Sequence, residues 1–162
     1  QLEALHQVFW RLESRWDSQT PDATVRHAYE ALPPALFLPP LGEAEILTSG
    51  RRFMDVGCGV GRNLALAHCL GWETAGVEVH GPYAEAAAKL VPEATVVRAD
   101  AFDLDEFAAD VVYLYRPLVR DDDEARLEDH VIRGMIPGSL LYLATTEPPR
   151  PLERVGQRLW RV

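Results

Sequence analysis

The sequence predicts an α/β fold with a mostly parallel sheet of five or six strands. Short apolar segments alternate with helical segments from Arg51 onward, and alternation of this kind produces parallel strands joined by right-handed crossovers. The chain has 162 residues, of which 48% are hydrophobic and 25% charged, the balance of one globular domain with one core. We divide it into an N-terminal helical cap, residues 1–50, and an α/β domain, residues 51–162.

The N-terminal cap is expected to contain three short helices and one loop. A first helix is indicated by apolar side chains spaced three and four residues apart: Leu2, Leu5, Phe9, Leu12 and Trp16. A second helix is expected from a cap at Thr20 to about Ala31. Four prolines between Leu32 and Leu41 predict a loop there, because proline interrupts regular structure. The third helix is expected over residues 43–48.

The α/β domain is expected to contain five strands that alternate with helices. The predicted strands are Phe53–Val56, Thr74–Val79, Thr95–Arg98, Asp110–Tyr115 and Ser139–Thr145. The predicted helices are Arg62–Leu70, Pro82–Leu90 and Asp121–Gly134. The fourth strand is apolar throughout, which is typical of a strand buried on both faces.

The C-terminal tail is short and rich in proline, so a shortened C-terminus is expected. It has room for one short strand or helix within Leu152–Val162, and a complete hairpin is not expected. A sheet that ended here with a bare edge would favour a homodimer or coverage by the N-terminal helices.

The strongest motif is Asp-Val-Gly-Cys-Gly-Val-Gly-Arg-Asn, residues 55–63, where the first strand leads into a helix. Glycines at such a turn let a ligand lie against the backbone, and the helix N-terminus adds free amides. The dinucleotide-binding fingerprint G-x-G-x-x-G requires a third glycine where this chain has Arg62. The motif therefore differs from that fingerprint, and an acid, Asp55, precedes its first glycine.

Together with four later features, this motif resembles the class I S-adenosylmethionine-dependent methyltransferases, which have a Rossmann-like three-layer fold. The features follow one another in the order expected of that family: Glu78 at the end of the second strand, Asp100-Ala101-Phe102 after the third, Asp110–Tyr115 as the fourth, and the Pro-Gly turn of residues 136–141. The resemblance covers about Arg51–Thr145.

The resemblance implies S-adenosylmethionine as the cofactor and requires no metal. It implies that the glycines let the methionine part of the cofactor lie close to the backbone, and that Asp55 contacts its amino group. Glu78 would accept the ribose hydroxyls, Asp100 and Ala101 would contact adenine, and apolar walls would complete the pocket. The predicted cofactor-binding residues are Asp55, Gly57, Cys58, Gly59, Gly61, Asn63, Glu78, Val79, Asp100, Ala101 and Phe102.

The methyl acceptor is less well defined by the sequence. The fourth strand leads into Tyr115-Arg116-Pro117 and lacks the [Asn/Asp/Ser]-Pro-Pro-[Tyr/Phe] signature of enzymes that methylate adenine, cytosine or glutamine nitrogens. Candidate catalytic residues are Tyr115, Arg116 and Tyr83, since an acceptor must lose a proton. The layout is more weakly similar to the small protein-lysine methyltransferases of the ATP synthase c subunit. Protein-lysine methylation and a non-catalytic cofactor-binding module are the alternatives.

The net charge of the chain limits the classes of partner that it is expected to bind. The formal net charge is -9, which disfavours nucleic acid because phosphate contacts call for basic residues. Residues 100–129 hold eleven acids against three arginines, which favours a neutral or cationic acceptor, either a small molecule or a protein. Two cysteines suggest a reducing cytoplasm, and no apolar run is long enough to span a membrane.

Overall fold

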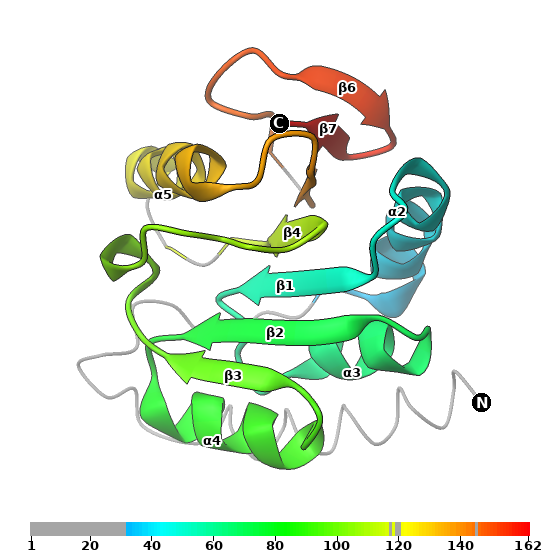
Figure 1. The fold of residues 1–162 in the computed structure, drawn as a ribbon. Coiled ribbons are helices and arrows are strands. Elements are labelled where there is room, and N and C mark those ends of the chain that lie inside the picture. Colours follow the sequence, from blue (N-terminus) through cyan, green and yellow to red (C-terminus); the bar gives the residue numbers. More distant parts are fainter. Residues whose placement is uncertain (1–31, 117, 119–120, 145) are drawn as a thin grey trace.

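The computed structural model describes residues 32–116, 118, 121–144 and 146–162, and its centre is a seven-stranded sheet (Figure 1). The strands are β1 (Arg52–Val56), β2 (Glu73–Glu78), β3 (Thr95–Arg98), β4 (Val111–Leu114), β5 (Leu140–Leu143), β6 (Glu153–Gly156) and β7 (Leu159–Arg161). Their order is β3-β2-β1-β4-β5-β7-β6, and only β7 runs against its neighbours. The α/β prediction is confirmed, and the ends of its five strands differ from the prediction by at most two residues.

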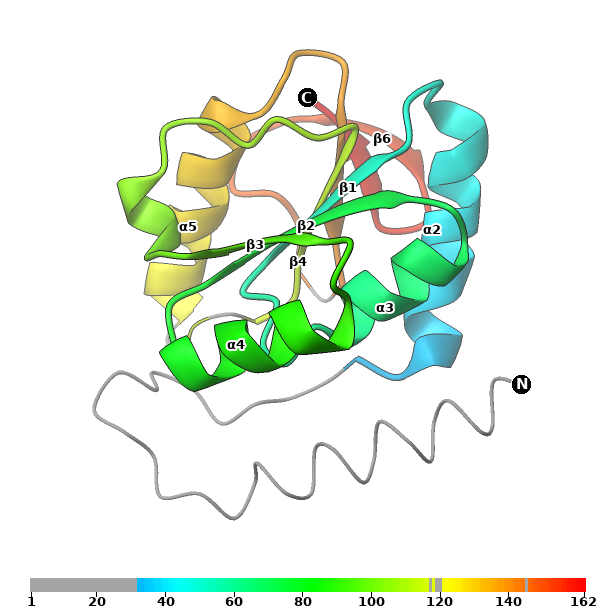
Figure 2. The ribbon, with the colours of Figure 1, turned by 60° about the horizontal axis from the view of Figure 1, so that its bottom comes forward.

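Helices cover both faces of the sheet, so the fold has three layers (Figure 2). They are α2 (Pro34–Leu47), α3 (Arg62–Cys69), α4 (Gly81–Leu90), the short 3-10 helix η1 (Ala101–Asp103) and α5 (Asp121–Gly134). The first three share one apolar cluster with the sheet, whereas α5 and η1 pack in a second cluster on the other face. The helices predicted before residue 32 lie outside the described residues. None of the described helices is long and apolar enough to cross a membrane.

The loop predicted over Leu32–Leu41 is wrong, because α2 starts at Pro34 and continues through Pro39 and Pro40. Proline lacks an N–H, so Pro40 cannot donate the helical hydrogen bond to the carbonyl of Leu36. The Tyr142 hydroxyl on β5 lies 3.1 Å from this carbonyl oxygen and donates to it instead. Burial raises the pKa of Tyr142, which keeps the hydroxyl protonated as a donor. A tertiary contact thus stabilises a helix that its own sequence disfavours.

Tyr142→Phe should therefore lower the free energy of unfolding by about 1 kcal/mol, because it removes the donor of the part-buried carbonyl of Leu36. The ring itself would still stack on Phe37, whose centroid lies 5.9 Å away. Urea denaturation of the two proteins measures the difference. Equal unfolding midpoints would show that the hydroxyl does not support α2.

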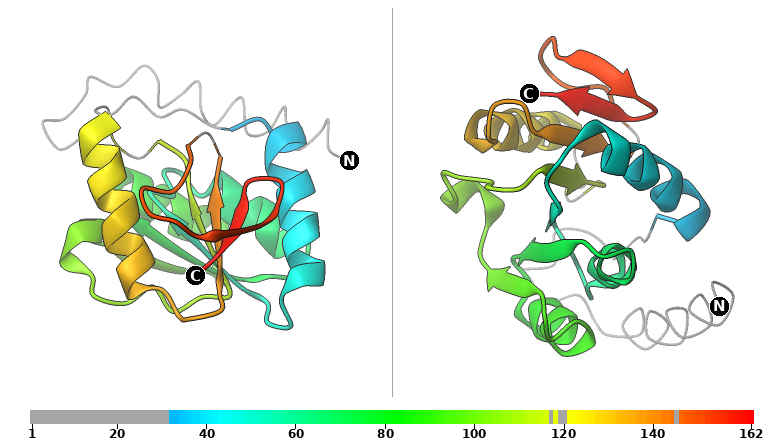
Figure 3. Two further views of the ribbon diagram at one scale, coloured as in Figure 1. Left: turned by 90° about the horizontal axis from the view of Figure 1, so that it is seen from above. Right: turned by 45° about the vertical axis from the view of Figure 1, so that its right-hand side comes forward.

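The C-terminus forms a complete hairpin, so the sheet has seven strands instead of the predicted five or six (Figure 3). Two very short strands, β6 and β7, make this possible, with Arg158 in a left-handed conformation (φ 64°) between them. Trp160 of β7 is buried in the second apolar cluster, and the amide of Gln157 donates to Glu43 on α2 at 2.8 Å. The bare edge beside β5 that motivated the expected homodimer is therefore covered by β7, and the homodimer stays a prediction.

Candidate functional site

The glycine loop that follows β1 is fastened to β2 by its backbone. Gly57, Gly59 and Gly61 have φ values of 83°, 53° and 85°, a conformation that other residues rarely adopt. The amides of Gly57 and Cys58 donate to the carbonyl of Val77 at 2.8 and 3.0 Å. These contacts hold the loop at the carboxyl ends of two neighbouring parallel strands, where ligands bind in open α/β sheets.

Two glycines, Gly61 and Gly76, let the loop pack closely against α4 and β2. A Cβ on Gly61 would lie 2.8 Å from the Cα of Ala87, so this glycine lets α4 approach the loop. A Cβ on Gly76 of β2 would lie 2.7 Å from the Sγ of Cys58. The thiol of Cys58 is buried against this strand, and burial raises its pKa. Cys58 therefore offers its backbone, and not its side chain, to a ligand at the loop.

Glu78 ends β2 with its carboxylate fixed by two amides. One oxygen accepts from Gly59 N and the other from His80 N, each at 2.8 Å. The side chain is buried, and desolvation raises its pKa, although the two amides and the nearby imidazole of His80 oppose that shift. Because each carboxylate oxygen can accept two hydrogen bonds, both can still accept from hydroxyl groups of a ligand.

Asp55 lies on the adjacent strand with its side chain only 2% exposed. Burial raises its pKa to about 8 and the charge of Glu78 adds to the shift, while a hydrogen bond from the Asn63 side chain opposes it. The Oδ1 atom of Asn63 is itself buried and finds no hydrogen-bond partner among the described residues. An acid and an amide oxygen thus meet at the start of the loop, a pair that suits a cationic ligand group.

The residues after β3 complete this edge of the sheet. Asp100 caps η1, because its carboxylate accepts from the amide of Phe102 at 3.1 Å. Glu78 is in register with Arg98 on β3, so the segment that follows β3 lies beside the end of β2. Val79 is 36% exposed although it is apolar, and Phe102 is half-buried. The fold therefore brings the predicted residues of three strands to one edge.

A family model described as "Methyltransferase domain" matches residues 54–143, more than half of the chain. The chain belongs to this methyltransferase family. Its match begins in β1 and ends with β5, so it includes the glycine loop and Glu78. The sequence-based assignment to class I methyltransferases is therefore confirmed.

Three solved structures illustrate the similarity of the fold. An S-adenosylmethionine-dependent methyltransferase from Mesorhizobium loti is 26% identical, with a TM-score of 0.53 over 67% of this chain and 52% of that one. A second from Methanosarcina mazei is 19% identical, with a TM-score of 0.57 over 65% and 56%. Phosphoethanolamine N-methyltransferase 2 of Haemonchus contortus, in complex with S-adenosyl-L-methionine, is 20% identical, with a TM-score of 0.56 over 67% and 27%.

The chain spans about half the length of several of the solved structures that it matches. A search of curated protein sequences finds no match. The family match and the neighbours, one of them a complex with S-adenosyl-L-methionine, indicate this molecule as the cofactor, in agreement with the sequence-based prediction.

The candidate catalytic residues of the methyltransferase domain lie at two separate places. Tyr115 and Arg116 follow β4, and Arg116 adopts a left-handed conformation with φ 42°. Tyr83 is on the first turn of α4, where its ring packs edge-on against His80 at 4.4 Å. Because β1 separates β2 from β4, Tyr83 lies on the same side of β1 as Glu78, and Tyr115 and Arg116 lie on the other side.

Two of the eleven acids counted in residues 100–129 are buried in the methyltransferase domain. Glu124 and Glu128 of α5 are 6% and 3% exposed, and Thr146 donates to Glu128 at 2.6 Å. Burial raises the pKa of Glu128, and the charge of Glu124 adds to the shift. Each of the two acids stands three positions before a buried apolar residue, Leu127 or Val131. This spacing in the sequence places both acids on the inner face of the helix.

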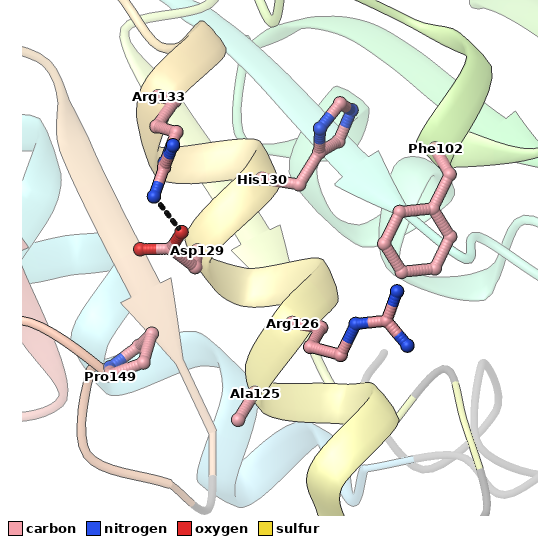
Figure 4. A pocket seen from close by; sticks show the side chains of 7 residues that line it. All are labelled: Phe102, Ala125, Arg126, Asp129, His130, Arg133 and Pro149. Atoms are coloured by element: carbon pink, nitrogen blue, oxygen red, sulfur yellow. Dashed lines mark ion pairs between the residues drawn. The ribbon is translucent and has the colours of Figure 1, made fainter.

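A cavity of about 540 Å³ lies on the outer side of α5 (Figure 4). It is lined by Phe102, Ala125, Arg126, Asp129, His130, Arg133 and Pro149. Asp129 forms an ion pair with Arg133 at 2.8 Å, and the Nε2 atom of His130 is 2.8 Å from the carbonyl oxygen of Leu104. Phe102, from the segment predicted to contact adenine, lines this cavity, but neither Asp55 nor Glu78 does. The cavity is therefore not the predicted cofactor pocket.

Proposed function

We propose that the domain transfers a methyl group from S-adenosylmethionine to an amine, hydroxyl or carboxylate of a small molecule or protein side chain. The observation that carries this proposal is the buried carboxylate of Glu78, held by the amides of Gly59 and His80. A carboxylate at this edge of the sheet, beside the glycine loop, can accept from both hydroxyls of a ribose, which supports Glu78 as the ribose-binding residue. When bound, the cofactor supplies a methyl group that its sulfonium has already activated.

Asp55 and Asn63 fit the amino group of the methionine part. An ammonium group would donate to the Asn63 Oδ1 atom that lacks a partner among the described residues, and its charge would stabilise ionised Asp55. Buried polar atoms are nearly always hydrogen-bonded in folded proteins, so an unpartnered oxygen beside a buried acid supports a cationic ligand group here.

The remaining cofactor residues would hold the adenine. Val79 offers an exposed apolar side chain just after β2, and Phe102 lies in η1, which follows β3. Because Asp100 accepts from the amide of Phe102, it fixes the backbone of this segment as well as offering its own polar group. With the cofactor aligned at three strand ends, the main task of the protein is to orient an acceptor in line with the methyl group.

The acidic balance of the chain supports a neutral or cationic acceptor. Residues 100–129 hold eleven acids and three arginines, and this segment includes β4 and the first half of α5. Tyr115, Arg116 and Tyr83 stay the candidates for contacting that acceptor. An acceptor that is rich in phosphate would meet like charges on this side of the fold.

The proposal is tested by mixing the purified protein with methyl-labelled S-adenosylmethionine and heat-treated cell extract. We expect labelled acceptor and S-adenosylhomocysteine to form with the wild type and not with Gly59→Val. Fractionation by size then separates labelled metabolites from labelled protein, and a labelled lysine would favour the protein-lysine alternative. If the cofactor binds but no acceptor fraction takes up label, the domain is a binding module and not an enzyme.

Binding of S-adenosylhomocysteine at pH 7 should release about one proton from Asp55. The free protein holds this acid mostly protonated because its pKa is about 8, and the ammonium of the ligand lowers that pKa. The release should disappear above about pH 9, where Asp55 is already ionised in the free protein. Calorimetry in buffers of different ionisation enthalpy counts the protons. Asp55→Asn is the control, and an unchanged proton count in this variant would assign the proton to another group.

A further inference from the structure

The imidazole of His80 is a second buried group at this edge of the sheet, after the Asn63 amide oxygen, that has a polar atom without a hydrogen-bond partner among the described residues. His80 is 7% exposed, and its Nδ1 atom is buried without a hydrogen-bond partner among the described residues. Buried polar atoms without partners are rare because each costs free energy of desolvation. A partner that the chain itself lacks is therefore expected.

The local helix cannot supply that partner. His80 is the N-cap of α4, where a side chain normally accepts from an amide of the first turn. Here that turn contains Pro82, which has no N–H, and the amides of Tyr83 and Ala84 donate to the carbonyl of His80. No side-chain cap is formed.

The position of His80 points to the ribose of the cofactor. Its amide donates to a carboxylate oxygen of Glu78 at 2.8 Å, so the backbone of His80 is held directly beside that carboxylate. A ribose hydroxyl has one hydrogen to donate and lone pairs that accept, so a hydroxyl that donates to Glu78 can at the same time accept from the Nδ1–H group of His80.

We propose that His80 is a second ribose-binding residue, whose Nδ1 atom pairs with one ribose hydroxyl of S-adenosylmethionine while Glu78 accepts from the ribose. This inference rests on the proposed function and adds a specificity element to it. The ring of Tyr83, which packs edge-on against His80, would hold the imidazole in place for that contact.

The test is a set of calorimetric titrations with S-adenosylhomocysteine and its 2′-deoxy and 3′-deoxy analogues. His80→Phe keeps a ring against Tyr83 and removes both nitrogens. We expect it to weaken S-adenosylhomocysteine binding by about three- to tenfold, the effect of one neutral hydrogen bond. For the analogue that lacks the contacted hydroxyl, wild type and variant should bind within about twofold of each other, because neither can form that bond.

Two further variants separate the nitrogen from the ring. The side-chain amide of His80→Asn reaches the place of Nδ1, whereas that of His80→Gln reaches the place of Nε2. Only the asparagine should restore binding, and this comparison decides the question if the phenylalanine variant does not fold. His68→Phe, on the exposed surface of α3, should bind all three ligands like the wild type.

The outcomes distinguish this inference from the proposed function. If the wild type does not bind S-adenosylhomocysteine, both fail. If the wild type binds S-adenosylhomocysteine and His80→Phe binds each of the three ligands as tightly as the wild type does, His80 does not contact the ribose. A uniform loss on all three ligands would likewise overturn the inference, because it would show an effect through the position of Glu78.

Discussion

Glu78→Ala is expected to lower the affinity for S-adenosylhomocysteine by about a hundredfold or more. The substitution removes the acceptor of the ribose hydroxyls, and hydrogen bonds to a charged group contribute about 1.5–3 kcal/mol each. It also releases the amides of Gly59 and His80, so the loop loses the contact that ties its second glycine to β2. Isothermal titration calorimetry measures the change directly.

A matched control exists at the other end of the same strand. Glu73→Ala removes an exposed acid from the start of β2 and should leave the affinity unchanged. Glu78→Gln keeps one oxygen as an acceptor and should fall between the alanine variant and the wild type. Unchanged affinity in a folded Glu78→Ala protein would mean that the ribose is held elsewhere.

Gly61→Ala is expected to lower the free energy of unfolding by about 2–5 kcal/mol. Its φ of 85° places an L-residue in the left-handed region, at a cost of about 1–2 kcal/mol. The new Cβ would also lie 2.8 Å from the backbone of Ala87, and overpacking of this kind costs about 1–3 kcal/mol more. Urea denaturation measures the sum.

Gly71→Ala separates these two contributions. This glycine has nearly the same φ, 84°, but a Cβ there would meet no atom within 4 Å. The variant should therefore lose only the conformational part, about 1–2 kcal/mol. Equal losses at the two positions would show that α4 moves away from the loop without cost, and that the fit of Gly61 against Ala87 is not needed for stability.

The parallel part of the fold could be predicted from the sequence because its signals are local. Each strand of β1–β5 is a short apolar segment followed by turn residues, and a glycine loop with an acid in front is recognisable from a few adjacent letters. Glu78 could be assigned because it ends such a segment. The arrangement of these ends at one edge then follows from the parallel alternation itself.

The remaining features depend on contacts between distant residues. α2 continues through Pro40 because the hydroxyl of Tyr142 reaches the carbonyl that the proline leaves free. The need for a glycine at position 76 becomes visible only when the thiol of Cys58 is placed against β2. The unpartnered nitrogen of His80 likewise requires coordinates, since its sequence context looks like an ordinary helix start.

The contacts that fasten α2 have a consequence for the order in which the molecule can form during synthesis. Its carbonyl at Leu36 is satisfied by a residue 106 positions later, and Glu43 receives a hydrogen bond from a residue 114 positions later. A growing chain that has just made this proline-containing helix therefore lacks the groups that stabilise it until β5 and the hairpin have left the ribosome. Such late, long-range closure favours slow and cooperative folding. Chains that stop before the hairpin should keep the contact of Tyr142 with α2 and lack the hydrogen bond that Gln157 donates to Glu43.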